Sequence, residues 1–144
     1  VLVVDDEPQI LRFLRASLGA SGFEVIEAET GAAALKRAAA DAPEIIVLDL
    51  GLPDMDGKDV IRALREWSEI PIIVLTASGG PPEWKRLSAM GADGFLVKPV
   101  DLEQLINKIP EAVLKTIHTA ARAAWAVGGA VQSGMDRLRG KKKG

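Results

Sequence analysis

Five short runs of aliphatic residues limit the folds that this chain can adopt. They lie at residues 1–4, 24–26, 45–48, 72–75 and 95–97. Most of these runs do not alternate polar with apolar side chains, which is typical of strands buried on both faces of a parallel sheet. No apolar run approaches the roughly 20 residues that a membrane-spanning helix needs. The pattern therefore predicts a sheet with both faces covered.

Between these runs, apolar residues recur at the spacing of one helix face, and residues that favour helix ends stand at the boundaries. The boundary residues are Pro8 in a first turn, Thr30, Asp56 and Asp101 as N-caps, and Gly22 and Gly91 as stops. A strand followed by a helix thus occurs five times within about 110 residues. This alternation predicts an open α/β sheet with right-handed crossovers.

Composition excludes several classes of protein. The 144 residues include no cysteine and one histidine, His118, so a disulfide scaffold, a thiolate zinc site and a histidine-based triad are not expected. The formal net charge is −2, which gives no strong attraction to nucleic acid, and no direct nucleic-acid partner is expected. The first residues form no basic leader, and we expect a cytoplasmic protein.

Polar side chains follow the predicted strands at the point where each strand ends. Asp5 and Asp6 come after the first run, Asp49 after the third, Thr76 after the fourth and Lys98 after the fifth. In a doubly wound sheet with strand order 2-1-3-4-5, the first and third strands flank the point where the winding reverses. Three carboxylates would meet there, and such a group requires a proton or a cation. Oxygen ligands alone favour a hard divalent ion, Mg²⁺ above all.

The same residues suit phosphoryl transfer. A carboxylate can attack phosphorus and form an acyl phosphate, and the charge on the transferred group then needs compensation. Lys98 would supply a compact positive charge, and Thr76 a hydroxyl donor.

Four separated motifs resemble the receiver domain of bacterial response regulators. They are residues 3–8 (VVDDEP), residues 49–57 (DLGLPDMDG), the pair Thr76–Ala77, and Gly91–Ala92–Asp93 followed by Lys98–Pro99. The resemblance covers about residues 1–109, and the first 77 residues look most like receivers of winged-helix transcription regulators. It implies a flavodoxin-like fold of five β–α units. It also implies a Mg²⁺-dependent switch in two-component signalling.

The resemblance further implies roles for the acidic residues. Asp49 would accept the phosphoryl group and, with Asp6, bind Mg²⁺ directly. Asp5 would hold a metal-bound water, and the main-chain carbonyl of Gly51 would be another ligand. Because Gly51 has no side chain at a position that often carries one, the lifetime of the phosphorylated state does not follow from the sequence.

Other residues gain expected roles from the same resemblance. Thr76 and Lys98 would bind phosphoryl oxygens, and the Lys98–Pro99 peptide bond is expected to be cis. Phe95 matches an aromatic position whose rotamer accompanies activation, although ordinary core packing is an equally good interpretation. Such a domain is no enzyme toward outside substrates: it catalyses only its own phosphorylation and dephosphorylation. Its partner would be a sensor histidine kinase or a phosphotransfer protein.

Two acidic residues and one proline fall outside these roles. Asp54 and Asp56 lie in the loop after the third strand, and turn formation and helix capping account for both. Pro110 falls at the end of, or inside, the last expected helix. An interior proline removes a backbone donor, so a break or kink is expected there.

Residues 110–144 differ from the rest of the chain. They hold seven basic and two acidic side chains, against 11 basic and 18 acidic ones in residues 1–109. We expect a helix over 111–127 and a basic end. Residues 111–138 could pack on their own domain, on a second copy or on a partner protein; a membrane surface is a less favoured partner. The segment could also derive from an unrelated protein fused to a receiver.

Two alternatives compete with the phosphoryl switch. One is a phosphorylation-independent interaction or scaffold domain that acts through its C-terminal helix. The other is a flavodoxin-like binder or hydrolase of small molecules. The second is disfavoured because no glycine-rich phosphate-binding loop follows the first strand.

Overall fold

The computed structural model describes residues 1–77 and 79–113. Its strands are β1 (Leu2–Val4), β2 (Ile26–Ala28), β3 (Ile46–Asp49), β4 (Ile72–Thr76) and β5 (Gly94–Val97). Its helices are α1 (Pro8–Ala20), α2 (Gly31–Asp41), α3 (Gly57–Arg65) and α4 (Pro81–Met90). A further helix begins at residue 102 and includes residue 113, the last one described.

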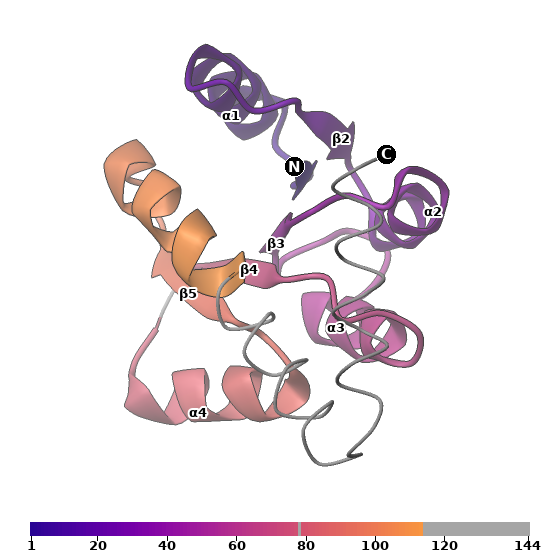
Figure 1. Cartoon of the computed structure of the whole chain (residues 1–144). Coiled ribbons are helices and arrows are strands. Elements are labelled where there is room, and N and C mark those ends of the chain that lie inside the picture. The colour runs from indigo at the N-terminus through magenta and orange to yellow at the C-terminus, as the bar shows by residue number, and fades with distance from the viewer. Residues whose placement is uncertain (78, 114–144) are drawn as a thin grey trace, which may run out of the picture.

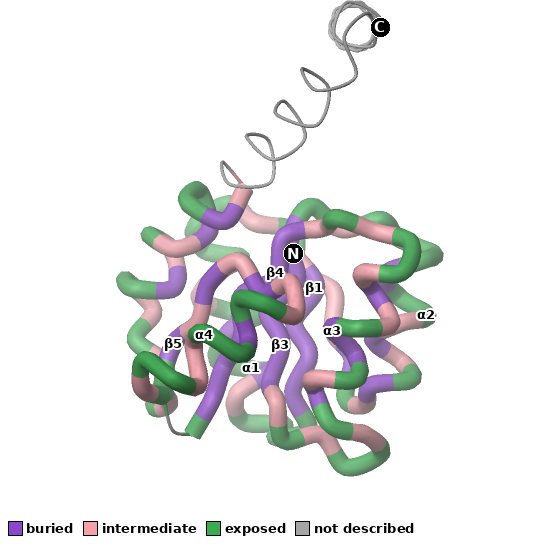
Figure 2. The backbone as a smooth tube through the Cα atoms, turned by 90° about the horizontal axis from the view of Figure 1, so that it is seen from below, coloured by how far each residue is buried: buried purple, intermediate pink, exposed green. Residues whose placement is uncertain are grey.

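The five strands form one parallel sheet in the order β2-β1-β3-β4-β5. The alternation of strands and helices predicts such an open α/β sheet, and the strand order is that of the flavodoxin-like fold that the resemblance implies. All residues of β1, β3 and β4 are buried, as expected for strands covered on both faces. Figure 2 shows these strands as a buried centre, with the exposed residues mainly on the surrounding helices and loops.

The helices form two layers around the sheet. Figure 1 shows α1 and the 102–113 helix on one side of the sheet, and α2, α3 and α4 on the other. Alternate residues of one strand enter different layers: in β1, Leu2 and Val4 pack against the three-helix side and Val3 against the two-helix side. This division explains why the strands are apolar without interruption.

Helix ends follow the expected residues. The side chain of Thr30 accepts a hydrogen bond from Ala33 N at the start of α2, and Asp56 accepts one from Lys58 N at the start of α3. Asp101 accepts one from Gln104 N. Pro8 occupies the first turn of α1, and Gly91 ends α4 with a positive φ of 114°.

Two local expectations were wrong. The second strand begins at Ile26, two residues later than predicted, because its backbone pairs with β1 from Ile26 to Ala28. The central residue of that edge strand is Glu27, and this charged residue interrupts the apolar pattern from which the strand was predicted. The Glu27 side chain pairs with Arg15 of α1.

The helix is also not broken at Pro110, where a break or kink is expected, since it continues from residue 102 to residue 113. Leu105, Ile109 and Ala112 of this helix are buried against the sheet, whereas Pro110 is exposed. Packing of the apolar face therefore outweighs the lost backbone donor. The rest of the expected 111–127 helix and the basic end lie outside the described residues. The described helices include none with the length and apolar character needed to cross a bilayer.

Candidate phosphoryl-acceptor site

Three carboxylates meet at the carboxyl edge of the sheet. Asp5 and Asp6 directly follow β1, and Asp49 is the last residue of β3, the neighbouring strand. One carboxylate oxygen from each of the three lies within 4.8 Å of the others. Asp5 and Asp49 are buried, whereas Asp6 is exposed. The topology thus brings together the acids that the sequence placed at these strand ends.

The ammonium group of Lys98 faces this acidic cluster. Lys98 follows β5, and its Nζ lies 3.1 Å from Asp49 Oδ1 and 3.3 Å from Asp5 Oδ2. A third carboxylate, that of Glu7, lies 3.7 Å from the same Nζ. The Lys98–Pro99 peptide bond is cis, as expected. One cation therefore faces several anions at close range.

Asp5 is buried, and only one of its two carboxylate oxygens accepts a hydrogen bond from the described residues. Its Oδ1 accepts a hydrogen bond from Glu7 N at 2.9 Å. Its Oδ2 is buried and accepts no hydrogen bond from the described residues, although the Lys98 ammonium lies nearby. Burial raises the pKa of Asp5, and the neighbouring charge of Asp49 adds to that rise against the opposing effects of Glu7 N and Lys98.

Lys98 shows the opposite balance. Burial by itself would lower its pKa, but the hydrogen bond and charge of Asp49, followed by the charge of Asp5, raise the pKa above its ordinary value. The lysine is therefore held in its charged form beside Asp49.

Thr76 and Phe95 belong to β4 and β5, and Lys98 directly follows β5. Thr76 ends β4 with 7% of its surface exposed, and its main-chain oxygen accepts a hydrogen bond from Lys98 N at 2.8 Å. Phe95 is partly buried and stacks on Trp84 of α4, with ring centroids 4.9 Å apart. The packing interpretation of Phe95 is thus supported, and it links β5 to α4.

The loop between β3 and α3 approaches Asp49 closely. A Cβ atom added to Gly51 would lie 3.9 Å from Asp49 Oδ2, so position 51 borders the Asp49 carboxylate. The loop closes on itself through Gly57 N, which donates a hydrogen bond to Leu50 O. Gly57 has no room for a side chain, since a Cβ would lie 2.6 Å from Leu50 Cα.

Asp54 caps a helix, as the sequence suggested, but the helix is α2 and not the one that follows Asp54 in the chain. Its carboxylate accepts hydrogen bonds from Gly31 N and Ala32 N, at 2.8 and 3.0 Å. It therefore caps the start of α2, a helix that lies more than 20 residues earlier in the chain. The contact ties the loop containing Gly51 to that helix.

A cavity of about 520 Å³ opens at this edge of the sheet. It is lined by Asp49, Thr76, Lys98 and Gly51, and also by three charged residues that sequence reasoning missed: Glu7, Lys58 and Glu83. Glu7 directly follows the predicted acids and could have been found by its position. Lys58 and Glu83 come from the first turns of α3 and α4. No sequence signal indicates that these side chains reach the cavity.

The residues fit a hard cation. The three acids offer only oxygen ligands, which suit Mg²⁺ or a similar ion. The buried Oδ2 of Asp5 lacks a hydrogen bond from the described residues, and that deficit is what a cation or its bound water would remove. The acidic cluster can therefore hold a metal ion.

A model of the response regulator receiver domain matches residues 1–110. The chain belongs to this family. It is a receiver domain of the response regulators of two-component systems, a family of signalling domains and not of metabolic enzymes.

Relatives of known name support the same assignment. The receiver domain is 46% identical over 121 residues to the transcriptional regulatory protein KdpE of Mycobacterium tuberculosis, with 84% of this chain and 53% of the relative covered. It is 44% identical over 125 residues to KdpE of Escherichia coli, with 85% and 54% covered. The chain thus spans about half the length of these relatives.

A solved structure agrees in fold. The receiver domain superposes on the chemotaxis protein CheY4 of Vibrio cholerae with a TM-score of 0.72 and 32% sequence identity. The match covers 77% of this chain and 95% of CheY4.

Proposed function

We propose that this receiver domain accepts a phosphoryl group on Asp49 in the presence of Mg²⁺ and uses it as a conformational switch. One observation carries the proposal: Lys98 Nζ lies 3.1 Å from Asp49 Oδ1, at an edge where Asp5 and Asp6 are close enough to share a cation. A buried acid with a purely structural role would require neither the nearby ammonium group nor the two further acids.

Asp49 is the nucleophile. One of its carboxylate oxygens attacks the phosphorus atom of the donor, so an O–P bond forms while the bond from phosphorus to the leaving atom breaks. The electron pair of that bond stays with the leaving atom, a histidine nitrogen or an acetate oxygen. Later attack by water on phosphorus restores the carboxylate and releases inorganic phosphate.

Lys98 and Thr76 compensate the charge of the transferred group. The ammonium group of Lys98 already faces Asp49 and would follow the phosphoryl oxygens as the carboxylate becomes an acyl phosphate. Thr76 ends the strand between β3 and β5 and lines the same cavity as Asp49 and Lys98, which supports a role for its hydroxyl group. A shift of Phe95 on β5 after phosphorylation would move α4, because the Phe95 ring stacks on Trp84 of that helix.

Asp5, Asp6, Asp49 and the main-chain carbonyl of Gly51 are the proposed Mg²⁺ site, with Asp5 acting through a bound water. The bound ion would neutralise negative charge on the phosphoryl oxygens. Asp5 and Asp6 would hold the metal ion and balance its positive charge, whereas Asp49 alone forms the covalent bond.

The partner that supplies the phosphoryl group is proposed to be a sensor histidine kinase or a phosphotransfer protein. The named relatives are transcriptional regulators, and the match to this chain covers 53–54% of their length. A homodimer or a partner contact through residues 111–138 also remains a proposal, because residues from 114 on lie outside the described part. We propose residues 1–109 as the receiver unit and 110–144 as its extension.

Labelling with acetyl phosphate and Mg²⁺ tests the proposal. Intact-protein mass spectrometry should show one added phosphoryl group that is stable in acid and lost in base. Asp49→Ala should abolish the label, and chelation of Mg²⁺ should do the same to the wild type. Asp59→Asn is the matched control, because Asp59 is an exposed acid on α3 that pairs with Arg62 away from the cavity. Equal labelling of wild type and Asp49→Ala would contradict the proposal.

A further inference from the structure

Lys58 is a second cation at the acceptor cavity. It lies in the first turn of α3, where its main-chain N–H donates to the N-cap Asp56. Its side chain lines the same cavity as Asp49, Thr76 and Lys98. One third of the Lys58 side chain is exposed, so the ammonium group can be reached by a ligand that enters from solvent.

Lys58 is paired across the cavity with Glu83. Its Nζ lies 3.8 Å from Glu83 Oε1, and Glu83 belongs to the first turn of α4. Glu83 is shared, since Arg86 Nη2 lies 3.5 Å from its other oxygen. A separation of 3.8 Å is long for a hydrogen bond, and the pair is partly solvated, so Lys58 can exchange this partner at small cost.

The charges around the cavity are strongly unbalanced. Its described lining includes five carboxylates and two ammonium groups: Asp6, Glu7, Asp49, Asp56 and Glu83 against Lys58 and Lys98. Lys98 is already surrounded by Asp5, Glu7 and Asp49. Lys58 is therefore the lining cation that is not held by the acids beside the acceptor.

We propose that Lys58 binds the phosphate group of the incoming phosphodonor, and that Glu83 competes with that phosphate for the lysine. This inference rests on the proposed function and specifies how its substrate enters. A phosphodonor such as acetyl phosphate is a dianion at neutral pH, and a cavity rich in carboxylates repels it. The Lys58 ammonium offsets that repulsion where the donor enters. Lys58 forms no covalent bond with the donor.

The two partners should change donor binding in opposite directions. Lys58→Gln should raise the acetyl phosphate concentration that gives half-maximal labelling rate by roughly fivefold, with little change in the maximal rate. Glu83→Gln should lower that concentration roughly twofold, because it frees Lys58 and removes a repelling charge. In the Lys58→Gln background, Glu83→Gln should have a smaller effect, since there is no lysine left to free.

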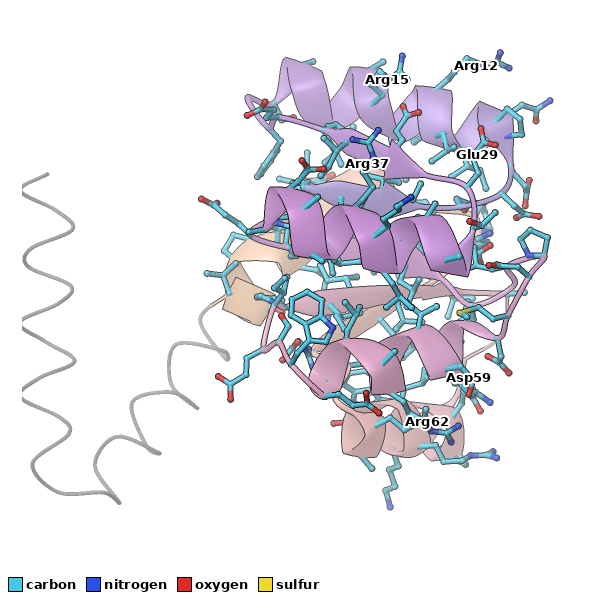
Figure 3. All side chains as sticks on the ribbon, turned by 90° about the vertical axis from the view of Figure 1, so that its right-hand side faces the viewer. Arg12, Arg15, Glu29, Arg37, Asp59 and Arg62 are labelled. Atoms are coloured by element: carbon cyan, nitrogen blue, oxygen red, sulfur yellow. The ribbon has the colours of Figure 1, made fainter. Side chains whose placement is uncertain are left out.

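Arg62→Gln is the matched control. It removes one positive charge from the same helix and breaks the ion pair between Arg62 and Asp59. Figure 3 shows these two residues together on the outer side of α3, and neither lines the cavity. The control should leave the half-saturating concentration within about 1.5-fold of the wild type, as expected for a screened surface charge.

A second measurement separates this inference from the proposed function. Acetonylphosphonate, an analogue that cannot transfer its phosphorus group, should bind the wild type several-fold more tightly than Lys58→Gln in an NMR titration. If the wild type binds the analogue in this way but gains no label from acetyl phosphate, the proposed function fails and the role of Lys58 stands. If Lys58→Gln and Arg62→Gln behave alike in both measurements, or if Lys58→Gln lowers only the maximal rate, the inference is overturned.

Discussion

The sheet has a charged cluster at each end, and the two clusters are built differently. At the carboxyl end, Asp5, Asp6 and Asp49 face the ammonium group of Lys98. At the amino end, Arg65 at the close of α3 pairs with Asp93, which precedes β5. Both clusters join residues far apart in the chain. They differ in how many of their polar atoms form hydrogen bonds with the described residues.

The amino-end cluster is saturated with hydrogen bonds. Arg65 donates to Asp93 Oδ2, to Gly91 O through two of its nitrogens, and to Ser68 O. Asp93 Oδ2 also accepts from Ile72 N at 2.9 Å. Gly91 is required here for two reasons: its φ is positive, and a Cβ would lie 2.7 Å from Arg65 Nε.

The contrast separates a well hydrogen-bonded cluster from one whose acids could hold a metal ion. Burial lowers the pKa of Arg65, and the charge of Asp93 opposes that change. At the other end, burial raises the pKa of Asp5, whose Oδ2 lacks a hydrogen bond from the described residues. A cluster whose negative charge is not fully compensated is able to bind a cation, whereas in the other cluster the arginine and the carboxylate already satisfy each other.

The largest effect is expected at the amino end. Arg65→Ala should lower the free energy of unfolding by about 2–3 kcal/mol, because it takes the arginine donors away from Asp93 and two main-chain carbonyls in a site about one fifth exposed. Urea denaturation at neutral pH measures the loss. Folded protein should still gain label from acetyl phosphate at close to the wild-type rate.

A control variant shows how much of the lost unfolding free energy comes from the hydrogen bonds of Arg65 with Asp93, Gly91 and Ser68. Arg62→Ala removes an arginine from the same helix, but its partner Asp59 is exposed. We expect a change below about 0.5 kcal/mol for this variant. Equal losses for the two variants would mean that the Arg65 network adds no more than a surface ion pair.

The fold was largely predictable because its determinants are local. The continuous apolar runs predicted parallel strands, and their order places Asp5 and Asp49 on neighbouring strands. The error at β2 has a physical cause: an edge strand tolerates Glu27, which contacts Arg15 of α1 and interrupts the apolar pattern. The uninterrupted helix at Pro110 was also not predictable from the local sequence, since burial of Leu105 and Ile109 stabilises the helix through the proline.

The site was predictable only where residues end a strand. Asp5, Asp49 and Lys98 were found this way, and the structure brings them together. The side chains of Lys58 and Glu83 reach the cavity from helix starts, where direction depends on how α3 and α4 pack. The Arg65 network joins residues 26 and 28 positions apart and leaves no local pattern.

An effect of opposite sign is expected at the carboxyl end. Asp5→Asn should raise the free energy of unfolding by about 1 kcal/mol when Mg²⁺ is absent, because it removes a buried negative charge beside Asp49 while Asn can still accept from Glu7 N. Addition of Mg²⁺ should raise the Tm of the wild type more than that of the variant. A loss of stability in Asp5→Asn without Mg²⁺ would show that the acidic cluster is already compensated.

The smallest effect concerns Asp54, which makes a satisfied contact next to the incompletely compensated cluster. Main-chain donors at Ala32 and Gly31 lower the pKa of this exposed carboxylate. A carboxylate whose pKa is lower in the folded protein stabilises the fold above its unfolded pKa of about 3.9, and this stabilisation is lost as the pH falls through the folded pKa. Asp54→Asn should therefore be less stable than the wild type at pH 7, by less than Arg65→Ala. Urea denaturation from pH 7 down to pH 3 should show the two curves converging in acid, whereas a difference independent of pH would assign the effect to the shape of the loop and not to the charge of Asp54.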